Sequence, residues 1–295
     1  MNHSPDITEF PGQNYGSDLT ERSAFTGSGA ARMVDLCESA HSGFDVALTT
    51  HARQWARSPD VYALVMQLIP KRLPAVTQSN LPLTQIHALL QLYWRLDCFP
   101  KPLVALLDAP LDAATAGLTS FGTHRVAGEN YRFTLRPDNG IPAAGIAYAL
   151  ARTPSALTMD LALAGHSLNR AEAWAAGLVT HCIPASAFPA IVAALADGQP
   201  VDPLLDGLHE DPSPALVRIE GATPSPINIS GAERAAIETL IAAARQMTVH
   251  DSLIATARVA DALSRRTGQD EFISTDVLFS TPKTGDLQLP PRSQL

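Results

Sequence analysis

The sequence predicts an α/β fold with a largely parallel sheet and a helical C-terminal region. Two short, continuous apolar segments, residues 61–69 and 103–109, are typical of strands that are buried on both faces. Each is followed by a loop or turn and then by a helix, and this order favours parallel pairing. In such sheets ligands bind beyond the carboxyl ends of the strands, which is where both connections are expected to lie.

The first helices are predicted from the spacing of apolar side chains. Residues 43–57 place them near helical spacing, and the sequence Ser-Pro-Asp that follows ends this helix. Residues 84–96 repeat them at i, i+3 and i+4. A turn of small residues at 113–115 is expected to precede a third helix, and residues 124–127 are expected to form the next strand.

Capping residues and glycines mark the elements further along the chain. One helix is predicted to end at Gly165, and a second to begin after Asn169, its N-cap, and to end at Gly177. A short strand then stops at Pro184. Three more helices are predicted, over residues 186–198, about 230–246 and about 250–266.

Composition divides the chain into five regions. Residues 1–30 are polar and rich in Gly, Ser, Asn and Pro, so we expect a flexible arm. Residues 31–197 form the predicted core, and the stretch 198–228, rich in Pro, Gly and Asp, is the predicted linker. Residues 229–280 are the predicted C-terminal helical region, and residues 281–295 are the predicted tail.

Charge and hydropathy exclude several classes of partner. The chain has 295 residues, of which 46% are hydrophobic, enough to bury a sizeable core. Its formal net charge is −8, and its 21 Lys and Arg residues are scattered, so no basic surface for nucleic acid or an anionic membrane is expected. No apolar run approaches the roughly 20 residues that a membrane span needs, and no signal peptide is recognisable. We therefore expect a cytoplasmic protein without nucleic-acid or membrane partners.

The sequence predicts no metal site. The three cysteines are odd in number and far apart, which fits neither a disulfide framework nor a CxxC metal site. No HxxxH pattern is present. Three histidines in the predicted core each stand alone in a regular element or at its end: His124, His166 and His181.

Three stretches carry a resemblance to a known family. They are "KPLVALLDAPLDAATAGLTSFGTHRVAGENYRF" from residue 101, "RPDNGIPAAG" from residue 136 and "LALAGHSLNRAEAWAAGLVTHCIP" from residue 161. Together with the order of the elements they resemble the crotonase superfamily, which includes enoyl-CoA hydratases and isomerases and 3-hydroxyisobutyryl-CoA hydrolases. The third stretch matches most specifically, at Ala171, Glu172, Ala173, Gly177, Leu178 and Val179.

This resemblance implies a crotonase (ClpP/crotonase-like) fold with repeated ββα units and a helical C-terminal region. The long helical stretch after residue 228 is closer to the hydrolase-like branch than to the short hydratases. Members of the family commonly assemble as trimers or pairs of trimers, so a homo-oligomer is expected, a trimer or hexamer. The resemblance also implies that acyl-CoA is the substrate or ligand and that no other cofactor is needed.

By resemblance, two backbone N–H groups form an oxyanion hole for the thioester oxygen, those of Val76 and Ala114. Both loops depart from the family pattern, because "AVTQS" and "AAT" stand where the family has glycines. Glycine lets a ligand approach the backbone closely. Thr77 and Thr115 are expected to contact the substrate, and their bulk, with that of Gln78, could also close the site.

Lys71 and Arg72 flank the first of these loops. The resemblance makes them candidates for contacts with the phosphates of CoA. The alternative is that both side chains are solvated at the end of a strand, as basic residues there often are. We carry them as candidate substrate-binding residues.

Asp138 stands where the family has a glutamate after proline, the general acid/base. It is shorter by one methylene, and Asp-Asn-Gly is also a strong turn signal, so a purely structural role is the alternative. Gly117 occupies the position of the second glutamate of the hydratases, and Ala143 that of the aspartate of the hydrolases. Neither branch's full set of side chains is present.

Two functions of different classes remain open. The first is an acyl-CoA enzyme, either an enoyl-CoA hydratase/isomerase or a 3-hydroxyacyl-CoA thioester hydrolase, with Asp138 as acid/base. The second is a catalytically impaired pseudoenzyme retained for binding acyl-CoA or a protein. The second is motivated by a contrast, since the motifs tied to packing match the family whereas those tied to chemistry depart from it.

Overall fold

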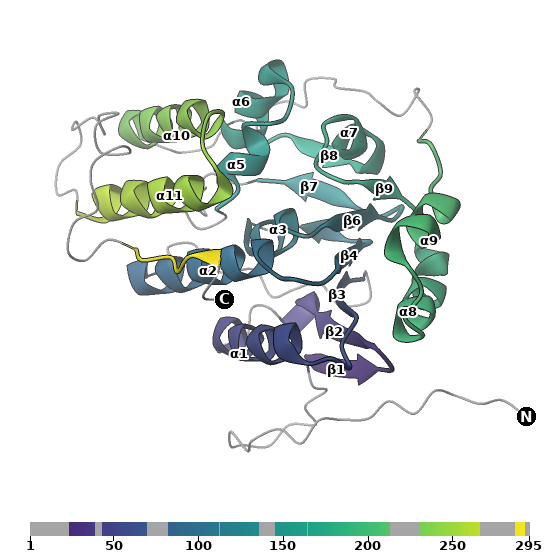
Figure 1. The fold of residues 1–295 in the computed structure, drawn as a ribbon. Coiled ribbons are helices and arrows are strands. Elements are labelled where there is room, and N and C mark those ends of the chain that lie inside the picture. Colours follow the sequence, from purple (N-terminus) through teal and green to yellow (C-terminus); the bar gives the residue numbers. More distant parts are fainter. Residues whose placement is uncertain are drawn as a thin grey trace, which may run out of the picture.

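Two β-sheets form the centre of the protein in this computed structural model, which describes residues 24–38, 43–69, 82–111, 113–135, 145–163, 165–212, 230–265 and 287–292 (Figure 1). The larger sheet has the strand order β1-β2-β3-β4-β6-β9. These strands are β1 (Phe25–Ser28), β2 (Ala31–Asp35), β3 (Ala63–Leu68), β4 (Leu103–Leu107), β6 (His124–Ala127) and β9 (His181–Cys182). The smaller sheet, in the order β5-β7-β8, contains β5 (Pro110–Leu111), β7 (Arg132–Thr134) and β8 (Ser167–Asn169).

The larger sheet is parallel from β2 through β9, and β1 pairs antiparallel with β2. Both of its faces are buried. In β3 the side chains of Leu64 and Met66 belong to one hydrophobic cluster, and Val65 between them belongs to another. β4 alternates in the same way, with Val104 and Leu106 in the second cluster. Burial on both faces explains why these strands are continuous apolar runs, and it confirms the prediction for residues 61–69 and 103–109.

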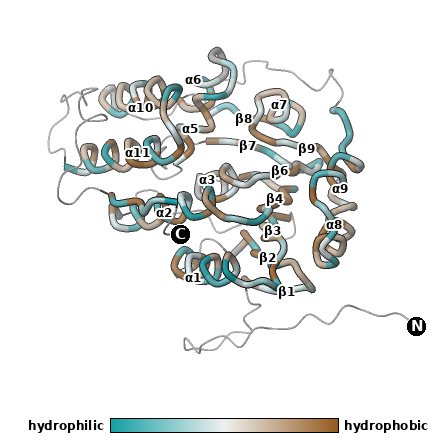
Figure 2. Tube along the Cα trace, viewed as in Figure 1, coloured by the Kyte–Doolittle hydropathy of each residue, from teal (hydrophilic) through white to brown (hydrophobic). Residues whose placement is uncertain are grey.

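Helices cover both faces of the larger sheet (Figure 1). On one face lie α8 (Phe188–Ala196) and α9 (Val201–Leu208), and on the other α1 (Phe44–Arg57), α2 (Leu83–Asp97) and α3 (Ala113–Ser120). Figure 2 shows the hydrophobic residues concentrated in the strands between these layers. The remaining described helices are α5 (Ala147–Leu150), α6 (Ser155–Leu163), α7 (Arg170–Ala175), α10 (Gly231–Ala244) and α11 (Val249–Ser264), with 3-10 turns at Leu36–Glu38 and Ala185–Ala187.

The C-terminal helices form a further layer against α2. α11 packs along α2, and both α10 and α11 contact α5 (Figure 1). His87 of α2 and Asp261 of α11 are joined by a 3.0 Å contact between Nε2 and Oδ1. Residues 287–292 run beside α2, where Leu287 and Leu289 are buried. This part of the predicted tail is therefore packed onto the fold.

Two segments that the sequence assigns to irregular structure are regular. The predicted arm extends to residue 30, but Phe25–Ser28 forms β1, because its backbone pairs with β2 and the Phe25 ring stacks on Phe44 at 5.5 Å. The predicted linker begins at residue 198, but Val201–Leu208 forms α9. Val201 and Leu205, one helical turn apart, are buried against the sheet, and a proline is tolerated in the first turn of a helix.

The helix boundaries predicted from capping signals are confirmed. Asn169 caps α7, since its Oδ1 accepts hydrogen bonds from the N–H groups of Ala171 at 2.9 Å and Glu172 at 3.0 Å. Glu172 completes a capping box by accepting from the Asn169 N–H at 2.8 Å. Gly165 and Gly177 both have positive φ, at 67° and 77°, as expected where a helix ends.

Candidate active site at the carboxyl ends of the strands

The two loops predicted to hold the oxyanion donors leave the same edge of the sheet. β3 and β4 are parallel neighbours, and their last residues, Leu68 and Leu107, are directly paired. The segment 71–81 follows β3, and α3 follows β4 after β5. The first loop lies outside the described residues, and with it the candidate residues Lys71, Arg72, Val76 and Thr77.

The second donor position lies at the beginning of α3. The sequence predicts a turn at residues 113–115, but α3 begins at Ala113, because alanine is a strong helix former and the glycine of this helix, Gly117, comes only after its first turn. Ala114 is therefore the second residue of the helix. The first four N–H groups of a helix have no partner within it, and this end carries a partial positive charge. The Ala114 N–H is thus a backbone donor of the kind that an oxyanion hole requires.

Thr115 is fully buried rather than exposed to a substrate cleft. Its carbonyl accepts a hydrogen bond from the Thr119 hydroxyl at 2.7 Å, one turn further along α3. Ala116, the next residue, is also buried. These contacts anchor the first turn of α3 in the core and fix the direction of its N–H groups.

The segment that contains Asp138 begins beside α3. β5 and β7 are parallel, with Leu111 paired to Phe133, so α3 and the segment 136–144 start next to each other. Asp138 itself lies outside the described residues. The segment ends at Gly145, whose φ is 60° and where an added Cβ would lie 2.8 Å from the Tyr93 ring of α2. The described residues that flank the acid-bearing segment therefore lie near α3 on one side and against α2 on the other.

Asp108 forms hydrogen bonds that connect several elements at this edge of the sheet. It is not among the residues singled out from the sequence. Its N–H donates to Leu68 O at 2.8 Å, and its carboxylate accepts from the N–H and Nδ2 of Asn130 at 2.8 and 2.9 Å. The side chain is buried, and an added Cβ at Gly128 would lie 2.3 Å from its Oδ1. Asp108 thus joins β3, β4 and the turn after β6. The signal in the sequence is one carboxylate that ends an apolar strand.

Arg125 in β6 anchors the α7–β9 region. Its Nε donates to Leu178 O at 2.7 Å and its Nη1 to Gly122 O at 2.9 Å. Burial lowers the pKa of this guanidinium, and the nearby Tyr131 hydroxyl opposes that effect. The third family stretch lies around it, with Ala171 and Ala173 fully buried. These motif residues therefore pack the fold and do not take part in the candidate chemistry.

The histidines that look isolated in the sequence are paired in space. His124 Nε2 lies 2.7 Å from Asp202 Oδ1, and His181 Nε2 lies 3.1 Å from Asp206 Oδ1, both carboxylates being on α9. The His124 and His181 rings are 6.1 Å apart. Both partners belong to α9, which lies in the part of the chain that the sequence assigns to the linker.

The described residues contain no metal cluster, and two of their three thiols are not activated. No group of three or more His, Cys, Asp or Glu in the described ranges is placed to hold a metal ion. Burial raises the pKa values of Cys98 and Cys182 to about 11, so both thiols stay protonated near neutral pH and are poor nucleophiles.

Among the helices described, none is both long and apolar enough to cross a membrane.

Comparison with known proteins places the chain in a recognised family. A family model described as "Enoyl-CoA hydratase/isomerase" matches residues 75–278. The chain is 28% identical over 177 residues to 3-hydroxyisobutyryl-CoA hydrolase 1 of Arabidopsis thaliana, covering 57% of this chain and 44% of that protein. It is 35% identical over 96 residues to mitochondrial 3-hydroxyisobutyryl-CoA hydrolase of Xenopus tropicalis, covering 32% and 25%. The matches span less than half the length of these relatives.

Solved structures share the fold. A carnitinyl-CoA dehydratase from Mycobacterium thermoresistibile superimposes with a TM-score of 0.66 at 16% identity, covering 90% of this chain and 97% of that one. An enoyl-CoA hydratase from Rhodobacter sphaeroides gives a TM-score of 0.59 at 17% identity, covering 79% and 82%. At this level of identity the likeness concerns the path of the backbone.

Proposed function

Because the chain belongs to the enoyl-CoA hydratase/isomerase family of the crotonase superfamily, we propose that it binds an acyl-CoA thioester where β3, β4 and β7 end. The observation that carries this proposal is the position of the Ala114 N–H in the first turn of α3. A thioester oxygen that gains negative charge would be stabilised there by a fixed donor and by the positive end of the helix. The second donor, by resemblance, is the Val76 N–H.

The reaction that we favour is hydrolysis of the thioester. The curated relatives named above are 3-hydroxyisobutyryl-CoA hydrolases, and Gly117, buried in α3, supplies no second carboxylate for hydration of a double bond. Asp138 would remove a proton from water while the water oxygen attacks the thioester carbon. Collapse of the tetrahedral intermediate then breaks the C–S bond, and the proton passes to the leaving thiolate of CoA. This chemistry needs no further cofactor.

A second candidate is binding without turnover. It is favoured by the side chains that replace glycines at both predicted donor loops, with Ala113, Ala114 and Thr115 at the start of α3. It is also favoured by the aspartate at 138, which reaches less far than a glutamate would, whereas proton transfer needs a heavy-atom distance of about 2.6–3.2 Å. In this case the chain would bind acyl-CoA, or a protein partner, and leave the thioester intact.

The two candidates are separated by measuring binding and thiol release on the same protein. We would titrate the purified chain calorimetrically with CoA and with 3-hydroxyisobutyryl-CoA, and follow release of free thiol from the second. Hydrolysis predicts turnover that falls by about 10²–10⁴ in Asp138→Ala, the usual contribution of a general base. Asp138→Glu is the matched control, because it keeps the carboxylate and restores the length that the family uses.

Each outcome favours one candidate. Binding with turnover that Asp138→Ala removes and Asp138→Glu retains supports the hydrolase. Binding of both ligands without thiol release supports the acyl-CoA-binding pseudoenzyme. Absence of binding overturns the acyl-CoA proposal and leaves a fold that serves another partner.

A further inference from the structure

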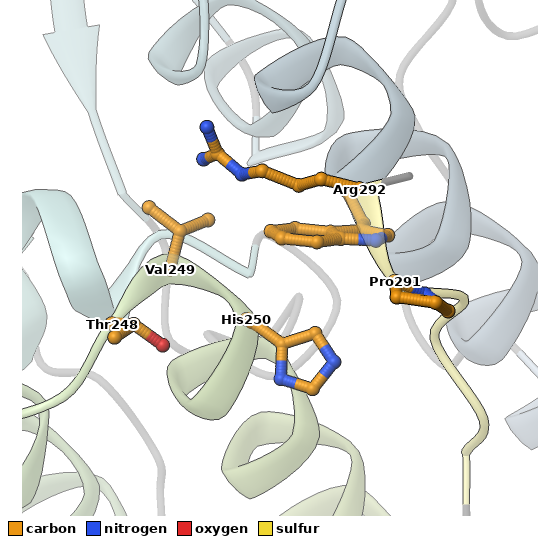
Figure 3. Close-up of a pocket in the computed structure, with 6 residues that line it drawn as sticks. Thr248, Val249, His250, Pro291 and Arg292 are labelled. Atoms are coloured by element: carbon orange, nitrogen blue, oxygen red, sulfur yellow. The ribbon is translucent and has the colours of Figure 1, made fainter. Parts of the chain in front are cut away.

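A cavity of about 420 Å³ lies between the C-terminal end of α2, the beginning of α11 and the last described residues of the chain (Figure 3). Six residues line this cavity, which we call the tail pocket: Trp94, Thr248, Val249, His250, Pro291 and Arg292. Small-molecule sites in proteins typically occupy about 300–1,000 Å³ and combine apolar walls with a few polar groups. The tail pocket has a volume within this range, and its lining combines apolar side chains with a few polar ones.

Specific contacts hold the walls of the tail pocket in place. The Trp94 indole N–H donates to Pro290 O at 2.7 Å, and this bond joins α2 to residues 287–292. Arg292 Nη2 lies 2.6 Å from Asp97 Oδ2, and its guanidinium carbon lies 5.4 Å from the centroid of the Trp94 ring. The His250 ring meets the same indole edge-on at 5.0 Å. The pocket is therefore built from fixed contacts between three parts of the chain.

The polar part of the lining favours an anion. The six lining residues include a guanidinium and an imidazole but no carboxylate. The two nearby acids are engaged, Asp97 with Arg292 and Asp251 with the Thr248 hydroxyl at 2.8 Å and with His250 at 3.3 Å. Arg292 has five N–H donors, and the contact with Asp97 is made through one nitrogen, Nη2. A bound anion could therefore be met by the remaining N–H groups of Arg292, while His250 lies on the opposite side of the pocket (Figure 3).

The apolar part of the lining and the nearby acids restrict the anion further. Trp94, Val249 and Pro291 offer a flat aromatic ring and two aliphatic surfaces, which suit a planar apolar body. Asp97, which is paired with Arg292, and Asp251, which lies 3.3 Å from His250, would repel a second negative charge. These two features favour a single carboxylate over a phosphate dianion.

We propose that the tail pocket binds a small aromatic monocarboxylate, with the carboxylate at Arg292 and the ring against Trp94 and Val249. The site is separate from the proposed acyl-CoA edge. α2 starts at Leu83, beside the first donor loop, and Trp94 comes eleven residues later, about 16 Å along the helix. The inference therefore does not depend on the proposed function.

Calorimetric titration of the purified full chain tests the proposal with benzoate as the probe. Benzamide has the same ring without the charge, and acetate has the charge without the ring. The proposal predicts saturable binding of one benzoate per chain, and affinities for benzamide and acetate lower by about tenfold or more, since a charge-assisted hydrogen bond or a buried ring contributes at least that much. Absence of saturable benzoate binding, or equal affinity for benzamide, overturns the proposal.

Two variants locate the binding. Arg292→Gln removes the cation from a largely exposed side chain and should weaken benzoate binding about tenfold. Val249→Phe narrows the pocket and leaves the Arg292–Asp97 pair intact, so its loss of binding would not reflect a released tail. Arg265→Gln, at the other end of α11, is the matched control and should bind as the wild type does. Unchanged affinity in both pocket variants contradicts the assignment.

Discussion

The α7–β9 region and the beginning of α3 contribute to the same central fold, but their sequences relate differently to the family pattern. In the α7–β9 region the sequence matches the family pattern at six positions: Ala171, Glu172, Ala173, Gly177, Leu178 and Val179. At the beginning of α3 the glycines of the pattern are replaced by Ala113, Ala114 and Thr115. The first region contributes side chains to packing, whereas the proposed chemistry of the second uses a backbone N–H.

The physical difference between side chain and backbone explains why both regions can serve the same fold. Arg125 and Glu172 act through side-chain groups, a forked guanidinium and a capping carboxylate, that few other residues can replace. The Ala114 N–H is present in any residue except proline, provided that α3 begins where it does. The packing residues therefore determine whether the donor is in place, and three predictions test this division.

Arg125→Leu should have the largest effect on stability. The variant leaves the carbonyls of Leu178, Gly122 and Gly177 without the donor that now reaches them. We expect the free energy of unfolding to fall by about 3 kcal/mol in urea denaturation. Arg125→Lys is the matched control, because it keeps the charge but cannot form the forked set of bonds. Its stability should lie between that of the wild type and that of Arg125→Leu. If the free energy of unfolding fell by less than about 0.5 kcal/mol in Arg125→Leu, Arg125 would not be important for packing the α7–β9 region.

Gly128→Ala should have an intermediate effect and should connect the two regions. Its Cβ would lie 2.3 Å from Asp108 Oδ1, so the buried carboxylate and the end of β4 must shift. We expect a loss of about 2 kcal/mol of stability, as in other overpacked cores, together with slower thiol release. Gly207→Ala in α9, where the added Cβ meets nothing within 4 Å, is the control and should be neutral or stabilising. Equal stability of Gly128→Ala and Gly207→Ala would show that the Asp108 carboxylate does not need the space at Gly128.

His51→Phe should have the smallest effect, visible only as pH dependence. The His51 ring lies 4.6 Å from Phe25 and 5.0 Å from Trp55, and burial lowers its pKa below the usual 6.5. The unfolded chain therefore binds the proton more tightly, so the neutral ring stabilises the fold above about pH 6.5. That contribution is lost as the pH falls through the folded pKa.

The measurement for His51 is the difference in stability between wild type and His51→Phe at several pH values. The wild type should lose stability relative to the variant as the pH falls from 7 to 5. His181, whose pKa is also lowered chiefly by burial, is present in both proteins and cancels in the difference. A difference that does not change with pH would show that His51 has the same pKa in the folded and unfolded chain.

Local signals explain which parts of this fold are predictable from the sequence. The apolar run at residues 61–69 and the Asn169 cap each act within a few residues, and β3 and α7 appear where expected. α9 is missed because prolines and aspartates obscure a short i, i+4 pair, Val201 and Leu205. β1 is missed because its stability comes from pairing with β2 and not from its own composition.

The candidate site is less predictable, because it depends on contacts between distant residues. The contact of Asp108 with Asn130 spans 22 positions, and that of His124 with Asp202 spans 78. Spacing and propensity do not encode such distances. The start of α3 at Ala113 also follows from anchoring by the buried Thr115 as much as from alanine's helix propensity. The predicted roles of Val76 and Asp138 remain predictions.

We infer that packing keeps the backbone donor of α3 in place although the glycines of the family pattern are absent around it. The most direct measurement compares thiol release from 3-hydroxyisobutyryl-CoA by Ala114→Pro and by Ala113→Pro. Each variant deletes one N–H in the first turn of α3, where proline is tolerated. We expect a rate lower by about 10²–10³ in Ala114→Pro, the usual loss for one oxyanion donor, and a nearly unchanged rate in Ala113→Pro. Equal rates in two folded variants would contradict it.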